Sequence, residues 1–200
     1  MRIAALATVA IIGTVAARTE KTRTSAECSV TVCRQGKADF GVKSAQKLAS
    51  EMFAAIGVTV DWHEGLTGCP PQSIQLSLTD RTPPELRPGA FAYATPYEDR
   101  IRIFYDRVAA HRPTLLLPHL LAHVMAHEIT HILQRSSHHS AQGIMKAQWT
   151  PDDFNAMMWK PLPFSREDVD LVYLGLAARA DRSLSGDKAA GRPRTAAEPQ

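Results

Sequence analysis

Alternation between apolar and polar residues predicts short β-strands in the first half of the chain. In residues 74–78, for example, one isoleucine and two leucines alternate with a glutamine and a serine, which is the period of a half-buried strand. Segments rich in glycine or proline separate several of these runs. The predicted strands are residues 28–33, 58–62, 74–78, 90–94 and 101–105.

A second period, of about 3.6 residues, predicts helices. Residues 42–56 place their apolar side chains on one helical face, and Gly57 follows at the usual position of a helix end. Residues 115–134 form a long apolar run without glycine, and the only proline in it is Pro118, near its start. The order of strands and helices predicts an α+β domain with a small sheet packed on two helices.

Two further helices are predicted near the C-terminus. A short one begins at Thr150 or Asp152 and is stopped by Pro161. A longer one, residues 165–178, opens with a serine and an aspartate three positions apart, which form a capping box. Residues 181–200 are rich in alanine, arginine, glycine, proline and serine, so we expect a disordered tail.

The N-terminus predicts export from the cytoplasm. Residues 1–17 combine an arginine, a continuous apolar run and small residues at a possible cleavage site, which is the pattern of a signal peptide. A buried strand or an uncleaved anchor is the alternative interpretation of this run. Residues 18–27 are polar and are expected to be flexible, and we expect the mature chain to be secreted or periplasmic.

Composition fits one globular domain, residues 28–180, because 44% of the chain is hydrophobic and 22% is charged. The net charge is only +3, and no basic run contains interleaved aromatic residues, so no nucleic-acid partner is indicated. No segment after the signal peptide is long and apolar enough to span a membrane. The oligomeric state is left open by the sequence.

Three cysteines accompany the predicted export. Cys28, Cys33 and Cys69 give an odd count, so one disulfide and one free thiol is the simplest outcome in an oxidising compartment. The sequence leaves open which pair forms. No C-x-x-C spacing is present, which argues against zinc ligation by cysteine.

The clearest chemical signal is the pentapeptide H-E-I-T-H inside the long apolar helix. His127 and His131 are four residues apart, so both imidazoles lie on one helical face, one turn from each other. A zinc ion can accept a nitrogen from each. Glu128 lies beside such an ion without belonging to the pair, where a general base can take a proton from water. The motif indicates a metal-assisted hydrolase.

Histidines recur every four residues along this helix, at positions 119, 123, 127 and 131. Because four residues overshoot one helical turn by about 40°, the four side chains cannot share one ion. Only the pair of His127 and His131 carries a glutamate directly after its first member. His123 is expected to be a buried polar residue or to support a ligand from behind, and His119 to be structural.

A catalytic zinc site needs a third protein ligand, and His138 and His139 are the candidates. The stretch resembles the active site of the metzincin peptidases, H-E-x-x-H-x-x-G-x-x-H followed by a methionine turn. Gly143-Ile144-Met145 supplies that turn, eighteen residues after His127, at a spacing close to that of the matrixins. Two positions depart from the motif: Gln134 replaces its glycine, and Ser137 its third histidine.

A second resemblance selects between the two candidates. The strings H-E-I-x-H-x-L and H-S-x-x-G-I-M, followed by Trp149, resemble a group of uncharacterised exported bacterial proteins, often from Acidobacteria. In that group the histidine before the serine corresponds to His139, which we therefore predict as the third ligand.

The metzincin resemblance also implies a fold and a mode of substrate binding. It implies a small, twisted, mixed sheet packed on an N-terminal helix and on the H-E-x-x-H helix, with a further helix at the C-terminus. Residues 89–94 would then form the edge strand that pairs with a peptide or protein substrate, although an ordinary edge strand is equally compatible. Met145 would form a hydrophobic floor under the metal.

The predicted function is that of an exported zinc-dependent peptidase in which Glu128 is the general base and His127, His131 and His139 hold Zn2+. A non-catalytic exported zinc-binding protein is the alternative, and its mark would be a closed shell of four ligands that includes both His138 and His139. A third arrangement would use Glu167 as the downstream ligand.

Overall fold

The structure is a computed structural model that describes residues 28–36, 39–86, 89–111 and 113–190. The predicted signal peptide, residues 1–17, and the segment 18–27 lie outside the described residues. The elements in chain order are β1 (Ser29–Gln35), α1 (Phe40–Ala54), β2 (Thr59–Glu64), β3 (Ile74–Thr79), β4 (Ala92–Thr95), β5 (Arg100–Phe104), α2 (Tyr105–Ala110), a 3-10 turn (Thr114–Leu116), α3 (Leu117–Gln134), α4 (Pro151–Met157) and α5 (Arg166–Ala190).

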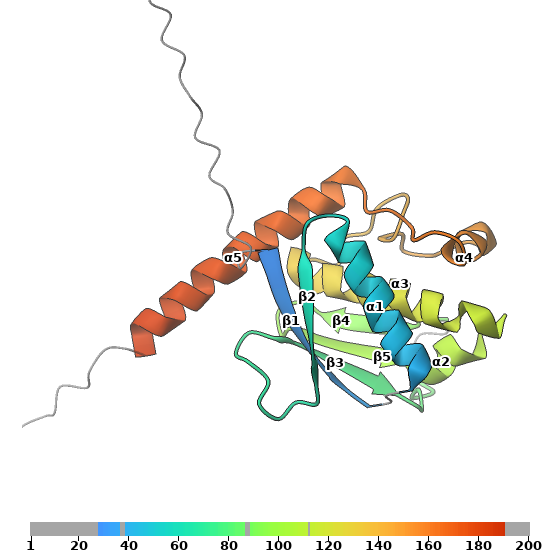
Figure 1. Cartoon of the computed structure of the whole chain (residues 1–200), viewed down its shortest axis with the longest axis horizontal. Helices are drawn as coiled ribbons and strands as arrows, with labels where there is room; N and C mark the ends of the chain where they lie inside the picture. The colour runs from blue at the N-terminus through green and yellow to red at the C-terminus, as the bar shows by residue number, and fades with distance from the viewer. Residues whose placement is uncertain (1–27, 37–38, 87–88, 112, 191–200) are drawn as a thin grey trace, which may run out of the picture.

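The five strands form one mixed sheet in the order β2-β1-β3-β5-β4 (Figure 1). The pairs β1–β2, β1–β3 and β3–β5 are parallel, and only β4 runs antiparallel to its neighbour. The predicted short fourth strand is therefore an edge strand of the sheet. The predicted fold class, an α+β domain with a small mixed sheet, is confirmed.

One face of the sheet is covered by helices and holds the core. Val32 of β1, Leu76 of β3 and Ile103 of β5 are completely buried there with the apolar faces of α1 and α3. Helix α1 packs on β2 and α3 packs on β4 and β5, and the two helices also pack on each other. The alternation that predicted each strand therefore separates this covered face from a polar outer face.

Helix α3 is the most buried helix among the described residues. Fourteen consecutive residues, from Leu120 to Leu133, are buried, including the polar side chains of His123, His127, Glu128 and His131. The helix begins two residues later than predicted because residues 114–116 form a 3-10 turn instead. A helix that is buried on all sides supports polar side chains only where they have partners or a function.

Helix α5 is longer than the sequence predicted. The capping box is confirmed, since the backbone N–H of Ser165 donates to Asp168 and that of Asp168 to the Ser165 hydroxyl. The helix continues to Ala190 instead of ending at residue 178, so the predicted disordered tail, 181–200, is helical in its first half. Alanine, arginine and leucine are good helix formers, and this outweighs the glycine and serines between them. Residues 191–200 lie outside the described part.

Gly175 allows α5 to lie directly against the end of α3. A Cβ atom built at this glycine would lie 1.6 Å from the carbonyl oxygen of Leu133, a backbone atom that cannot rotate away. We expect Gly175→Ala to lower the free energy of unfolding by about 3 kcal/mol or more, although alanine is the better helix former. Urea unfolding measures the effect. The matched control is the exposed neighbour Leu174, whose change to alanine should stay within about 0.5 kcal/mol; equal stability of both variants would contradict the packing argument.

The structure pairs Cys33 with Cys69 in a disulfide and leaves Cys28 as a free thiol. This bond ties the turn-rich loop after β2 to the outer face of β1. Tyr105, predicted as the last residue of a strand, instead starts the short helix α2, and its hydroxyl donates to the Asp39 carboxylate at 2.9 Å. In the described part of the chain, no helix has the length and apolar character needed to cross a membrane.

Candidate metal centre

The last two turns of α3 bring the imidazoles of His127 and His131 together. Both side chains are buried, with exposed fractions of 8% and 6%, and their Nε2 atoms lie 3.0 Å apart. Two nitrogens bound to one tetrahedral zinc ion at 2.0–2.1 Å would lie about 3.3 Å apart. The spacing of four residues on the helix therefore places the two nitrogens close to the separation that a zinc ion requires.

The outer nitrogens of the two rings are fixed by backbone carbonyls. His127 Nδ1 lies 2.8 Å from the Ile144 oxygen, and His131 Nδ1 lies 2.9 Å from the Ser136 oxygen. Because a carbonyl only accepts, each Nδ1 carries the proton and each Nε2 keeps its lone pair. Two acceptor nitrogens facing each other at 3.0 Å repel, unless a cation lies between them. The geometry therefore fits a bound metal ion.

His139 joins this pair as the third member. The candidate ligand atoms of His127, His131 and His139 all lie within 4.8 Å of one another, so these three histidines could hold one metal ion. The His139 ring centroid lies 5.3 Å from that of His127 and 4.8 Å from that of His131. His139 is exposed while the other two are buried, so the group opens to solvent on its side.

The neighbouring histidine points elsewhere. His138 Nε2 lies 3.9 Å from a carboxylate oxygen of Glu167, and both side chains are largely exposed. Neither residue belongs to the three-histidine group. The sequence left His138 and His139 as competing candidates, and only His139 lies where a ligand is needed.

The end of α3 differs from the metzincin motif at the position of the motif's glycine. Gln134, at the motif's glycine position, is still helical, and the left-handed turn occurs at Arg135, with φ of 50°. Ser136 N–H then donates to the His131 carbonyl, which closes the helix end. The left-handed residue therefore comes one position after the motif's glycine position, and His139 comes two positions after the motif's third-histidine position.

Asp168 anchors the segment that carries His139. Its side chain is fully buried, and the hydroxyl of Ser140, next to His139, donates to it at 2.7 Å. The backbone N–H of Ser140 also donates to the carbonyl of Met145 at 2.8 Å. The capping box had revealed Asp168 only as a helix-capping residue, and its contact with Ser140 was missed because it joins positions 28 residues apart.

The turn of Gly143, Ile144 and Met145 lies against the metal group. Gly143 has φ of 77°, and a Cβ atom there would lie 2.2 Å from the Pro163 oxygen, so only glycine fits. The Ile144 N–H donates to the same Pro163 oxygen, while the Ile144 carbonyl accepts from His127. Met145 is fully buried beside Ile144. This turn therefore orients His127 directly.

Glu128 is buried in the same helix, with 7% of its surface exposed. No hydrogen bond or ion pair joins its carboxyl to another described residue, and burial raises its pKa to about 8. A cation held by the three histidines would favour the ionised form, as opposite charges do at short range. The carboxyl is thus free to exchange a proton with a water molecule or a substrate.

Burial also keeps the two helical histidines neutral. It lowers the pKa of His127 to about 4 and that of His131 to about 3, and neighbouring imidazoles contribute to both shifts. The pKa of His139 is lowered for the same reasons. Metal ligation needs the unprotonated imidazole, so these environments favour it at neutral pH.

His123 is a structural member of the helix. Its Nδ1 donates to the His119 carbonyl at 2.7 Å, and its Nε2 accepts from the Leu162 backbone N–H at 3.0 Å. The side chain is 1% exposed and lies outside the three-histidine group. Its prediction as a buried polar residue is confirmed, and it ties α3 to the segment before α5.

The buried His123 should make the fold acid-sensitive. Burial lowers its pKa from 6.5 to about 4. Between these values the unfolded chain binds a proton here that the folded chain does not, so the free energy of unfolding falls by about 3 kcal/mol as the pH falls through this window. We expect the free energy of unfolding, measured with urea at pH 7 and pH 4.5, to fall less in His123→Gln than in the unchanged protein. The glutamine amide can still accept from the Leu162 N–H. An unchanged pH dependence would contradict this role.

An aromatic cluster extends from the metal group toward the edge strand. Trp149 lies edge-on to His127 at 5.6 Å between centroids, and Phe154 lies 6.5 Å from Trp149. Phe91, just before β4, packs on Phe154 at 6.4 Å. These ring contacts therefore connect His127 of α3, through Trp149 and Phe154, to the residue that precedes the edge strand.

Comparison with known proteins supports the fold. No protein-family model matches the sequence, and no curated protein matches it significantly. Among solved structures, that of archaemetzincin from Methanopyrus kandleri superposes with a TM-score of 0.55, over 74% of this chain and 94% of that chain, at 14% sequence identity. The chain therefore has a fold similar to that of archaemetzincin, as the predicted metzincin-like architecture requires.

Proposed function

We propose that this chain is an exported zinc-dependent peptidase. The observation that carries the proposal is the convergence of His127, His131 and His139, whose candidate ligand atoms lie within 4.8 Å of one another. The unpartnered carboxyl of Glu128 lies on the same helix as the first two. Three histidine ligands and a fourth, open position are the pattern of a catalytic zinc site. The archaemetzincin-like fold supports the same class of enzyme.

In the proposed reaction the three histidines bind the metal and Glu128 transfers protons. A zinc ion held there would supply a Lewis acid that polarises a carbonyl and lowers the pKa of water. His127 and His131 would hold it through Nε2, because their Nδ1 atoms donate to the Ile144 and Ser136 carbonyls. His139 would be the third ligand. Glu128 takes the proton of the attacking water and passes it to the leaving amine. Met145 is proposed as the apolar floor beneath this group.

The substrate is proposed to be an extended peptide or protein segment. Strand β4 is the edge of the sheet, and α3 packs beside it. An extended chain can pair with the free edge of β4, which would lay it across the three histidines.

The position of His138 favours catalysis over a closed structural site. A closed shell needs a fourth ligand, and within the described residues His138 instead faces Glu167 at 3.9 Å. Glu167 is 71% exposed and is not in the three-histidine group, which also argues against the arrangement with a downstream glutamate.

The direct test combines metal analysis with peptide hydrolysis. The purified mature chain should contain about one zinc ion per molecule, and it should cleave members of a mixed peptide library in a chelator-sensitive way. Failure to bind zinc would overturn the proposal. Zinc binding without any hydrolysis would favour the non-catalytic alternative.

Export gives a separate prediction. If residues 1–17 are a signal peptide, the native protein should begin near Arg18 and occur outside the cytoplasm. Mass spectrometry of the intact protein from cell fractions measures both features. Detection of the full-length chain with its Met1 end in the cytoplasm would show that the segment is not cleaved.

A further inference from the structure

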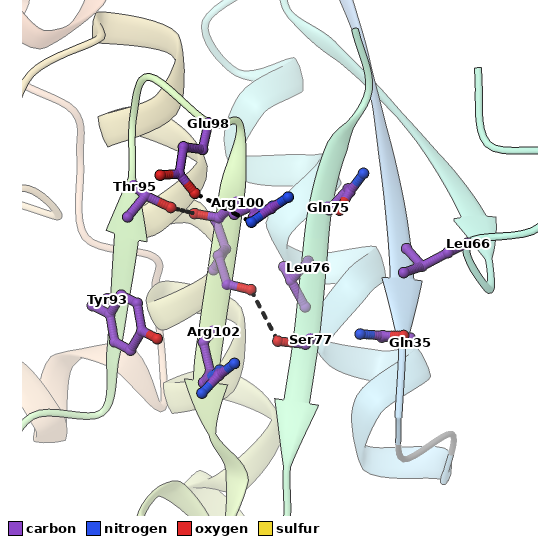
Figure 2. A pocket seen from close by; sticks show the side chains of 11 residues that line it. Gln35, Leu66, Gln75, Leu76, Ser77, Tyr93, Thr95, Glu98, Arg100 and Arg102 are labelled. Carbon is purple, nitrogen blue, oxygen red and sulfur yellow. Dashed lines mark hydrogen bonds and ion pairs between the residues drawn. The ribbon is translucent and has the colours of Figure 1, made fainter. Parts of the chain in front are cut away.

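The outer face of the sheet, opposite the helices, carries a polar groove of about 320 Å3. Figure 2 shows that it crosses from β4 over β5 and β3 to β1, with Leu66 of the loop after β2 at its far side. Its principal polar side chains are those of Gln35, Gln75, Ser77, Tyr93, Arg100 and Arg102. The metal group lies on the helix-covered face, so this groove is a separate surface.

Two arginines on β5 dominate the charge of the groove. Arg100 and Arg102 occupy alternate positions of one strand, so both side chains leave the sheet on the outer face. Arg100 is paired with Glu98 at 3.3 Å, but both side chains are more than half exposed, so the pair is weak. The Arg102 guanidinium lies 5.9 Å from the centre of the Tyr93 ring.

The positive charge of this surface is incompletely balanced. No carboxylate of the described residues lies within ion-pair distance of Arg102, and Glu98 is the only acidic residue among those that line the groove. Like charges close together on one face of a sheet repel each other. A bound anion that contacts both guanidinium groups would remove this repulsion and gain charge-assisted hydrogen bonds.

The spacing of the two arginines matches an extended peptide. Residues that face the same side of a strand are about 6.6–6.8 Å apart, and the same distance separates alternate side chains of any extended chain. Acidic residues at alternate positions of a bound peptide would therefore reach Arg100 and Arg102 together. On the neighbouring strands β3 and β1, the side-chain amides of Gln75 and Gln35 offer both donors and acceptors to a bound peptide.

We propose that this outer groove binds an extended acidic peptide segment, with carboxylates at alternate positions on Arg100 and Arg102. The exposed ring of Tyr93, on the neighbouring strand β4, lies beside Arg102 and provides an apolar contact there. Leu66 provides a second apolar surface on the opposite side of the groove. The site is independent of the metal group and does not depend on the proposed peptidase activity. It would give the protein a second surface for acidic polypeptides.

Fluorescence anisotropy with two labelled peptides tests the proposal. In one peptide glutamate alternates with serine, and in the other glutamine replaces each glutamate. All measurements use a Glu128→Ala background, so that no peptide is consumed. We expect the acidic peptide to bind about tenfold more tightly than the glutamine peptide, and the double change Arg100→Gln and Arg102→Gln to abolish this preference.

The matched control removes the same charge from the opposite face. Lys43 and Lys47 are exposed on α1, and changing both to glutamine should leave the affinity for the acidic peptide unchanged. Circular dichroism verifies the fold of each variant. Equal binding of both peptides, full binding by the double arginine variant, or an equal loss in the lysine control would each overturn the proposal.

Discussion

Replacing Glu128 by alanine is expected to abolish peptide hydrolysis while leaving metal binding and the fold in place. The carboxyl is the only acidic group on the buried face of α3, and it follows the first histidine of the metal group directly. Removing a general base costs about 10²–10⁴-fold in rate. Metal analysis and hydrolysis of the best library peptide measure both halves of this expectation.

Control variants distinguish a general-base role of Glu128 from a role as a metal ligand or as a structural residue. Glu128→Gln keeps the shape of the side chain and should be as inactive as the alanine variant. Glu167→Ala removes an exposed carboxylate beside His138 and should keep both zinc and activity. If Glu128→Ala lost its zinc, or stayed active, Glu128 would not be the general base. Loss of zinc in Glu167→Ala would instead identify a downstream glutamate ligand.

Local patterns predicted most of the secondary structure, because each element has a face that the core must bury. The alternation in residues 74–78 and the periodicity of residues 42–56 correspond to β3 and α1, with ends displaced by one or two residues. Helix ends depend on single hydrogen bonds, such as the bond from the Val42 N–H to Asp39 that starts α1. The histidine pair of the H-E-x-x-H motif could also be predicted from the sequence, because a separation of four residues on a helix fixes the distance between two side chains.

Features that join distant parts of the chain lay beyond this reasoning. The pairing of Cys33 with Cys69 depends on where the loop after β2 returns to the sheet. The bond between Ser140 and Asp168 depends on how α5 packs on α3, and Gly175 permits that packing. The outer groove gathers residues from four strands, so no short segment of the sequence displays it.

Changing His139 to alanine should weaken zinc binding far more than changing His138. The candidate ligand atoms of His139, His127 and His131 lie within 4.8 Å of one another, and loss of His139 would leave only two of these three ligands. We expect the affinity to fall by more than about 100-fold, since even residues that only support a ligand cost 10–100-fold when they are changed. Titration of the metal-free chain with zinc against a chromophoric chelator measures the effect.

His138→Ala is the matched control, because it removes an adjacent histidine from the same segment. That side chain is 42% exposed, and its contact with Glu167 is at 3.9 Å, so its loss should change the zinc affinity by less than about threefold. The two side chains face apart, and the Ser140 hydroxyl, held by the buried Asp168, keeps the segment in this orientation. A larger loss at His138→Ala would reverse the ligand assignment. Equal, large losses in both variants would indicate a four-ligand shell, which leaves no position for water and would exclude the peptidase mechanism.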